Sequence, residues 1–126
     1  MRDSCNDSYG NREVPASLIL EAVMLQIKPS SAIAFEAAFR QASPIIASMK
    51  GYCGHDLHRC LETHGKYLLL VRWETLEDHT VGFRGSPDYQ TWKQLLHHFY
   101  DPFPVVEHFE GVMSCGGLSP SNDGLR

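Results

Sequence analysis

The sequence of 126 residues lacks both a basic stripe and a long hydrophobic run, and each absence excludes a class of protein. Its 11 Lys and Arg residues against 15 Asp and Glu residues give a formal net charge of −4, and no segment gathers positive charge into a phosphate-binding surface. The longest apolar run, residues 18–25, is interrupted by Glu21 and is too short to span a bilayer or to act as a signal peptide. We therefore expect a cytoplasmic protein that binds neither nucleic acid nor membranes.

Cysteine and metal-ligand patterns are scarce as well. The four cysteines form no CxxC pair, so we expect reduced thiols. Seven histidines are present, but His55 and His58 are three apart on an expected strand and therefore point to opposite faces. His97 and His98 are adjacent on an expected helix, where their side chains diverge by about 100°. Since neither pair has the i, i+4 helical spacing of zinc motifs, we predict no metal site and treat the two helical histidines as surface residues.

The sequence does contain one segment that can form a core. Hydrophobic residues make up 43% of the chain, enough for a single compact domain that buries roughly two-thirds of its unfolded surface. Residues 1–17 are polar and rich in Asp, Asn, Ser and Gly, which predicts a flexible arm, and residues 114–126 predict a flexible tail. The folding unit is therefore expected over residues 18–113, which contain no internal repeat.

The first half of this unit changes its hydrophobic period from that of a strand to that of a helix. Residues 18–28 are apolar with one polar interruption, which predicts a strand with one buried face. Residues 29–51 predict an amphipathic helix that Pro44 kinks or restarts and that Gly51 ends. The apolar stripe of this helix, at three- and four-residue steps, consists of Phe35, Phe39, Ala42, Ile46 and Met49.

The second half begins with a hairpin and ends with a strand. Residues 53–62 alternate in polarity and residues 66–73 are strongly apolar, and the short turn THG joins them. Thr75 is expected to cap a short helix, and the Ser-Pro pair at 86–87 opens a second, longer one. Residues 103–113 are expected to return as the last strand.

The order β-α-β-β-α-β predicts an α+β fold of the ferredoxin-like, split βαβ type. Such a chain forms an antiparallel four-stranded sheet with its helices on one face. Residues 66–73 are apolar at both parities, so the face without helices also needs a cover. A second copy of the chain can provide it, which predicts a homodimer whose two sheets face each other as a dimeric α+β barrel.

The segment YLLLVRWETLEDHTVGFRGSPDYQTW, residues 67–92, resembles the antibiotic biosynthesis monooxygenase family. In that family a strand ending in Trp is followed by an acidic helix start, a His on the next turn and a second helix entered through Ser-x-x-Tyr or Phe. The similarity extends to the helix FEAAFRQASPIIASMKGY and to the closing strand VEHFE. It implies the same ferredoxin-like fold and dimeric barrel.

Some members of that family are oxygenases of aromatic polyketides that use neither metal nor flavin. An oxygenase without a cofactor needs a base for a phenolic or enolic proton, donors for the resulting anion, and an apolar pocket that excludes water. His79 titrates near neutral pH and is the candidate base, and Phe83 lies one helical turn further on the same face. Trp73, at the strand end, is the candidate for a planar wall and an N–H donor. The resemblance thus implies catalytic roles for His79 and Trp73 and no cofactor.

Further candidates for substrate binding are Tyr89 and Trp92, one turn apart on the second helix, and Arg84 or Arg72 as the cation that holds an anion. Each candidate also has a structural explanation. Trp73 can be a core anchor, and Tyr89 and Trp92 can pack. Arg84 can interact with the end of its helix, and Arg72, opposite in parity, can serve the dimer face. His79 can cap its helix or bond a neighbouring carboxylate, Glu74 or Asp78.

Two functions from different classes remain at this stage. The first is a cofactor-independent monooxygenase acting on a small electron-rich aromatic or quinol-like substrate. The second is a non-catalytic dimeric barrel that binds a small hydrophobic ligand or has a structural role. A haem-degrading branch of the family carries an Asn on the first strand and a Trp and a His ten residues apart. Here the first strand has no Asn and Phe83 stands ten residues after Trp73, so haem degradation is disfavoured.

Overall fold

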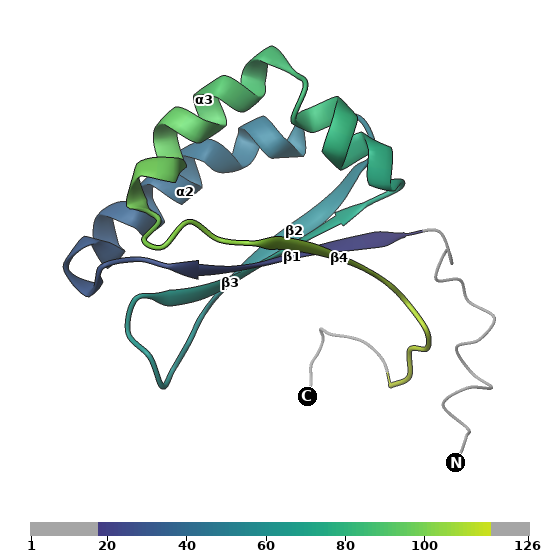
Figure 1. Ribbon diagram of the computed structural model, residues 1–126. Coiled ribbons are helices and arrows are strands. Elements are labelled where there is room, and N and C mark those ends of the chain that lie inside the picture. The colour runs from purple at the N-terminus through teal and green to yellow at the C-terminus, as the bar shows by residue number, and fades with distance from the viewer. Residues whose placement is uncertain (1–17, 117–126) are drawn as a thin grey trace.

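The computed structural model describes residues 18–116, and within them one four-stranded antiparallel sheet carries two helices on a single face (Figure 1). The strands lie in the order β2-β3-β1-β4. Their bounds are β1 Ile19–Gln26, β2 Tyr52–Arg59, β3 Lys66–Trp73 and β4 Val106–Glu110. The helices are α2 Ala32–Ala47 and α3 Pro87–Leu96, and short turns η1 Pro29–Ser31, η2 Asp78–Phe83 and η3 His97–Phe99 complete the chain. The predicted ferredoxin-like order is confirmed, whereas the expected arm at residues 1–17 and most of the expected tail lie outside the described residues.

The core lies between the sheet and the two helices. Val23 of β1 pairs with Leu69 of β3 on one side and with Val106 of β4 on the other, so three strands present apolar side chains to the same face. From α2, Phe35 is fully buried and its ring lies 5.0 Å from that of Tyr67. The predicted helical stripe is therefore the core-facing side of α2, because its four members within the helix are buried.

Helix α2 runs through Pro44 without interruption, so of the two predicted effects, a kink or a restart, the restart is wrong. Proline removes one backbone N–H and leaves the carbonyl four residues earlier, at Arg40, without its helical partner. Both Pro44 and Arg40 are exposed, so water can satisfy that carbonyl at little cost. The helix ends at Ala47, and Gly51 then takes φ +81° in the turn into β2.

Strand β3 spans the predicted residues 66–73, whereas the other three strands are shorter than their sequence patterns suggested. β2 ends at Arg59, three residues before the predicted limit, and β4 spans five residues where eleven were predicted, 103–113. Pro104 explains the late start of β4, because proline cannot donate to a ladder of hydrogen bonds. The expected division of the β2 histidines is confirmed: His55 pairs with the buried Val71, and His58 pairs with Leu68 on the other face.

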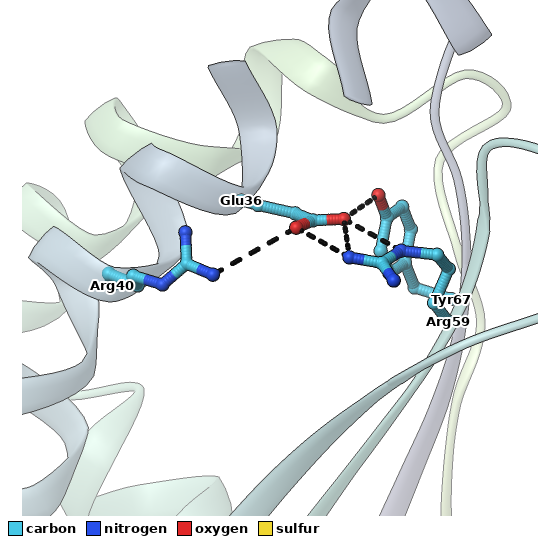
Figure 2. Close-up of polar contacts among 4 residues, drawn as sticks. All are labelled: Glu36, Arg40, Arg59 and Tyr67. Atoms are coloured by element: carbon cyan, nitrogen blue, oxygen red, sulfur yellow. Dashed lines mark hydrogen bonds and ion pairs between the residues drawn. The ribbon is translucent and has the colours of Figure 1, made fainter. Parts of the chain in front are cut away.

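A polar cluster fastens α2 to the β2-β3 hairpin (Figure 2). The Glu36 carboxylate accepts hydrogen bonds from Arg59 at 3.0 Å (Nε) and 2.8 Å (Nη2) and from the Tyr67 hydroxyl at 2.6 Å. Arg40, one turn along α2, lies 4.0 Å from the same carboxylate. The hydrogen bonds from Tyr67 and then Arg59 hold the pKa of Glu36 below its usual range. This cluster anchors the helix away from the cleft described below.

The face of the sheet opposite the helices bears no other described element (Figure 1). By register it carries alternate residues of each strand, including Leu20 and Met24 of β1, Leu68 and Leu70 of β3, and Phe109 of β4. The side chains of Met24 and Phe109 are 44% and 49% exposed. An apolar surface of this kind is typical of an interface rather than of a solvated face.

Two further expectations concern the thiols and the membrane. Cys53 and Cys60 carry free thiols, but Cys115 is disulfide-bonded, so the expectation of reduced thiols was wrong for Cys115. Over residues 18–116, no helix has the length and apolar character needed to cross a bilayer.

Candidate active site

A cleft of about 410 Å³ opens between the helix-facing side of the sheet and the α3 side of the molecule. Its apolar walls come from β1, β3, β4, η2 and α3, and include Val23, Leu69, Phe83, Trp92 and Val106. Six polar side chains also line the cleft: Glu21, His79, Arg84, Tyr89, His97 and Tyr100. A concave, mostly apolar space with a few converging polar groups is the usual form of a site for a small molecule.

Glu21 is a carboxyl group buried in the apolar face of β1, with only 6% of its surface exposed. Its Oε1 accepts a hydrogen bond of 2.9 Å from the indole Nε1 of Trp73. Its Oε2 has no hydrogen-bond partner within residues 18–116. Burial raises the pKa of Glu21 above its usual range, although the Trp73 hydrogen bond and the charge of Arg84 both act to lower it. The result is a carboxylate that accepts a proton more readily than an exposed one.

His79 stands next to Glu21 and is 3% exposed. Its Nε2 lies 3.4 Å from Oε1 of Glu21, and its Nδ1 forms a 2.8 Å hydrogen bond with Nε2 of His108. Burial first, then the charges of Arg84 and His108, lowers the pKa of His79 to about 3. The imidazole is therefore neutral at pH 7, with one nitrogen that donates and one that accepts. The carboxyl group beside it comes from β1 and not from Glu74 or Asp78, the neighbours that the sequence suggested.

The segment that carries His79 has an unusual backbone. Thr75 caps its start, as predicted, by accepting a 3.1 Å hydrogen bond from the backbone N–H of Asp78. Residues 78–83 then form a π-helix, in which the N–H of Arg84 reaches the carbonyl of His79 at 3.1 Å. Single π-helical turns are frequent at functional sites. Here the turn places His79 and Phe83 together on the cleft wall, as their spacing predicted.

Trp73 has a different position from the other candidates. It is fully buried and does not line the cleft. Its indole stacks on the His79 ring with centroids 5.4 Å apart and an interplanar angle of 22°, while its N–H binds Glu21. Trp73 therefore contacts the two polar groups of the cleft and fixes their orientation from the core side, which combines the core-anchor and the donor interpretations.

The second helix supplies the opposite wall. Ser86 caps α3 by accepting a 3.2 Å hydrogen bond from the Tyr89 N–H, as predicted. The Phe83 ring meets Tyr89 and Trp92 edge to face, with centroids 5.0 and 5.5 Å apart. These two aromatic residues thus pack and line the cleft at once. The exposed guanidinium of Arg84, at the rim, has no hydrogen bond or ion pair to another described residue.

Sequence reasoning missed three residues and misplaced a fourth. Glu21 had been treated only as an interruption of an apolar strand, and Tyr100 and His108 had not been considered. His97 was expected at the surface, but it is half-buried and lines the cleft, and burial lowers its pKa. A signal for Glu21 was available, because it shares strand parity with Val23 and therefore points to the core face.

No group of three or more His, Cys, Asp or Glu side chains in the described part of the chain is arranged to hold a metal ion. The Glu21, His79 and His108 side chains instead lie against one another. That the protein works without a metal or another cofactor stays a prediction.

Comparison with known proteins now defines the family. The profile of the family described as antibiotic biosynthesis monooxygenase matches residues 18–95. The chain belongs to this family. The uncharacterized protein YczJ of Bacillus subtilis (strain 168) is 63% identical over 95 residues, which cover 75% of this chain and all of YczJ.

Solved structures agree with this family membership. A candidate antibiotic biosynthesis monooxygenase from Bordetella bronchiseptica is 35% identical, with a TM-score of 0.74 over 77% of this chain and 99% of that one. A variant of SnoaB, a cofactor-independent oxygenase from Streptomyces nogalater, has a TM-score of 0.67 at 16% identity, covering 79% of this chain and 97% of SnoaB. At that identity the likeness to SnoaB shows the shared fold alone. Together the comparisons support a function of the monooxygenase type.

Proposed function

We propose that this family member is a cofactor-independent monooxygenase that oxidises a small electron-rich aromatic substrate, such as an anthrone or a hydroquinone, with molecular oxygen. One observation carries the proposal: the buried carboxyl of Glu21 and the neutral imidazole of His79 stand side by side in an aromatic-walled cleft. A pair of this kind can remove a proton from a phenolic or enolic group without placing a lasting charge in the site.

The reaction uses the substrate as its own reductant. The Glu21–His79 pair takes the acidic proton, and the resulting anion transfers an electron to oxygen. Recombination forms a carbon–peroxide bond. For an anthrone, the first proton returns to the distal oxygen of the peroxide. The second C–H proton of the same ring carbon is then removed, its electron pair forms the second carbonyl of the quinone, and the O–O bond breaks. The distal oxygen leaves as hydroxide and takes up that second proton to become water. One oxygen atom of O₂ is thus in the product and the other in water, with no external electron donor.

The remaining cleft residues support this chemistry. The unpaired Arg84 guanidinium at the rim attracts and stabilises the substrate anion. Phe83, Tyr89 and Trp92 form the planar wall against which an aromatic ring packs, and they limit the access of water to the anion. Trp73 orients the carboxyl group of Glu21 through its N–H and the imidazole of His79 through stacking.

The test is oxygen uptake by metal-free protein with a panel of anthrones and hydroquinones, with and without air. We expect aerobic turnover that falls by about 10²-fold or more in Glu21→Gln and in His79→Ala, since each removes a proton-transfer group. His98→Ala, which changes an exposed histidine outside the cleft, serves as the matched control and should keep wild-type activity. Absence of oxygen uptake across the panel, or undiminished uptake in both cleft variants, contradicts the proposal.

A ligand-binding protein without catalysis is the second candidate, and the open cleft favours its ligand-binding form over a structural one. Such a protein would hold the same aromatic compounds in the cleft. Calorimetric binding of an anthraquinone that is abolished by Phe83→Ala, with no oxygen uptake from any reduced substrate, would support this second candidate.

A further inference from the structure

Three polar side chains from three separate elements lie next to one another beside the cleft. Glu21 on β1 lies 3.4 Å from His79 on η2, and His79 is bonded at 2.8 Å to His108 on β4. Glu21 and His108 are register partners of the β1-β4 ladder, so the sheet itself places them on the same face. The π-helical turn then lays the His79 ring 5.0 Å from the His108 ring, centroid to centroid.

The chain of groups leads from inside the cleft to the surface. Glu21 and His79 are 6% and 3% exposed and line the cleft, whereas His108 is only partly buried and does not line it. The Nδ1 of His108 has no hydrogen-bond partner within residues 18–116, and the residue is only partly buried. A proton on Glu21 therefore has a path to solvent that does not cross the substrate.

We propose that His108 is a positioning and proton-relay residue, which exchanges protons between the cleft and solvent through His79 during the reaction proposed above. The inference rests on that reaction for its role in turnover. The transfer itself needs only the three side chains and water.

The relay balances in protons. The carboxyl proton of Glu21 moves to Nε2 of His79 while the Nδ1 proton of His79 moves to Nε2 of His108, and the Nδ1 proton of His108 passes to water. Both imidazoles end neutral in the opposite tautomer, with Glu21 as carboxylate. One proton returns along the same path to the distal peroxide oxygen and resets both tautomers. The remaining C–H proton of the reacting carbon passes to the leaving hydroxide, so the two protons of the water balance the two that the ring carbon loses. No net proton is produced, in agreement with the overall conversion of anthrone and O₂ to quinone and water.

Low basicity of both imidazoles supports this mode of transfer. Burial lowers the pKa of His79 and, with Arg84, that of His108. Neither ring therefore holds a proton for long, and an exchange between neutral tautomers is favoured over a stable imidazolium. Arg84 is the charged group common to both shifts, and it disfavours a trapped positive charge between Glu21 and the surface.

A purely structural bond between His79 and His108 is the alternative, because such a bond also fastens η2 to β4. The two explanations differ in what restores a variant. A glutamine at position 108 can still hydrogen-bond to His79 but cannot pass a proton on. A small base in solution can replace a relay but cannot replace a lost anchoring contact.

The first test measures oxygen uptake in dilute buffer at fixed pH. His108→Ala and His108→Gln should both lower kcat about tenfold, a smaller loss than the 10²–10⁴-fold of a direct acid–base group, with KM unchanged. Added imidazole should restore both variants in a saturable way. His64→Ala, which removes an exposed histidine of the β2-β3 turn, is the matched control and should neither lose activity nor respond to imidazole. Full activity in His108→Gln, or a loss that imidazole does not restore, would overturn the relay.

A second test does not depend on turnover. 4-Nitrophenol absorbs differently as phenol and phenolate, so a stopped-flow pH jump follows the ionisation of the molecule bound in the cleft. The wild type should re-equilibrate about tenfold faster than His108→Gln, and imidazole should remove the difference. Equal rates would contradict the relay. If instead the wild type consumes no oxygen yet shows the imidazole-sensitive difference, the relay stands and the proposed oxygenase activity is what fails.

Discussion

Glu21 is the residue on which the site depends, and it is also the one whose burial works against stability. A carboxyl group on an apolar strand face loses hydration, and the single hydrogen bond from Trp73 does not replace it. Proteins retain such groups mainly where their chemistry is used, since perturbed pKa values concentrate at functional sites. The position of Glu21 between Trp73 and His79 fits that pattern.

Glu21→Gln is expected to stabilise the protein at neutral pH while removing its activity. The folded-state pKa of Glu21 is raised, so its favourable contribution is present below the unfolded pKa and is lost as pH rises through the folded pKa. The glutamine keeps an acceptor for Trp73 and does not ionise. Urea unfolding at pH 5 and pH 8 measures the free energy of unfolding of both proteins. The value for the variant should rise relative to that of the wild type as pH rises, by at most about 1.4 kcal/mol per pH unit.

Glu36→Gln is the matched comparison, because the pKa of Glu36 is shifted downward by its hydrogen bonds from Tyr67 and Arg59. Replacement of Glu36 by Gln should lower the free energy of unfolding at pH 8. If Glu21→Gln weakens the protein at pH 8 as Glu36→Gln does, the carboxyl group of Glu21 is not strained by burial.

His79 should make the protein sensitive to mild acid. Its folded pKa of about 3 lies below the unfolded value near 6.5, so its contribution is complete above pH 6.5 and declines as pH falls toward 3. The difference in unfolding free energy between wild type and His79→Gln should shrink across that window, with a slope approaching about 1.4 kcal/mol per pH unit. Replacement of the exposed His64 by Gln is the matched control for the substitution itself. Parallel curves for wild type and His79→Gln would contradict the buried, neutral imidazole.

At the scale of single residues, sequence patterns predicted those side chains whose neighbours are close along the chain. The four-residue step from His79 to Phe83 and the cap at Thr75 are local features, and both are confirmed. Glu21 and His108 are 87 positions apart, and only the β1-β4 pairing brings them together. A single sequence gives no register between distant strands, so the pairing of Glu21 with His108 could not be predicted.

At the scale of elements, the turn before β2 and the π-helical turn η2 support each other. Gly51 adopts φ +81°, and a Cβ there would overlap the carboxylate of Asp78, the residue before His79. The carbonyl of Gly51 also accepts a 2.8 Å hydrogen bond from the N–H of Glu74. The position of His79 is therefore coupled to a glycine 28 residues earlier.

Gly51→Ala should lower the free energy of unfolding by about 1–3 kcal/mol, because it adds both backbone strain and a clash with Asp78. It should also reduce oxygen uptake by displacing His79. Gly111→Ala is the control: a Cβ there meets no atom within 4 Å, and the substitution should change both quantities little. Equal stability of the two variants in urea would show that the Gly51 turn does not position η2.

The limits of prediction at this scale have physical causes. Period and capping signals gave the order of strands and helices. They did not give the π-helical turn, because the change from an i, i+4 to an i, i+5 bond leaves no distinct sequence pattern. The restart predicted at Pro44 does not occur, because the cost of proline in the helix depends on solvent access to the carbonyl of Arg40. That access is a property of the folded molecule.

At the scale of the whole molecule, the uncovered face of the sheet leads us to expect a homodimer. One apolar face of the sheet packs against the helices. The other, which carries Leu68 and Leu70, is covered by no other described element (Figure 1). If two copies of the chain met by this face, each would cover the apolar face of the other, and the predicted barrel would close.

Light scattering should therefore give twice the chain mass of 14.2 kDa. Leu70→Glu, which places a charge on the face, should shift the mass toward one chain. Ile33→Glu makes the same chemical change at a residue that is 87% exposed on α2, and should leave the dimer intact. A wild type that scatters as a single chain at concentrations of about 100 μM would contradict the expected dimer.

The central claim is that the Glu21–His79 cleft inserts one oxygen atom of O₂ into an aromatic substrate, and the isotope content of the product tests it most directly. Metal-free protein is given an anthrone under ¹⁸O₂ in ordinary water, and the quinone is analysed by mass spectrometry. The account predicts one ¹⁸O atom per quinone formed, and no enzymatic product from Glu21→Gln. Quinone without ¹⁸O, or hydrogen peroxide in place of water as the reduced product, would contradict it.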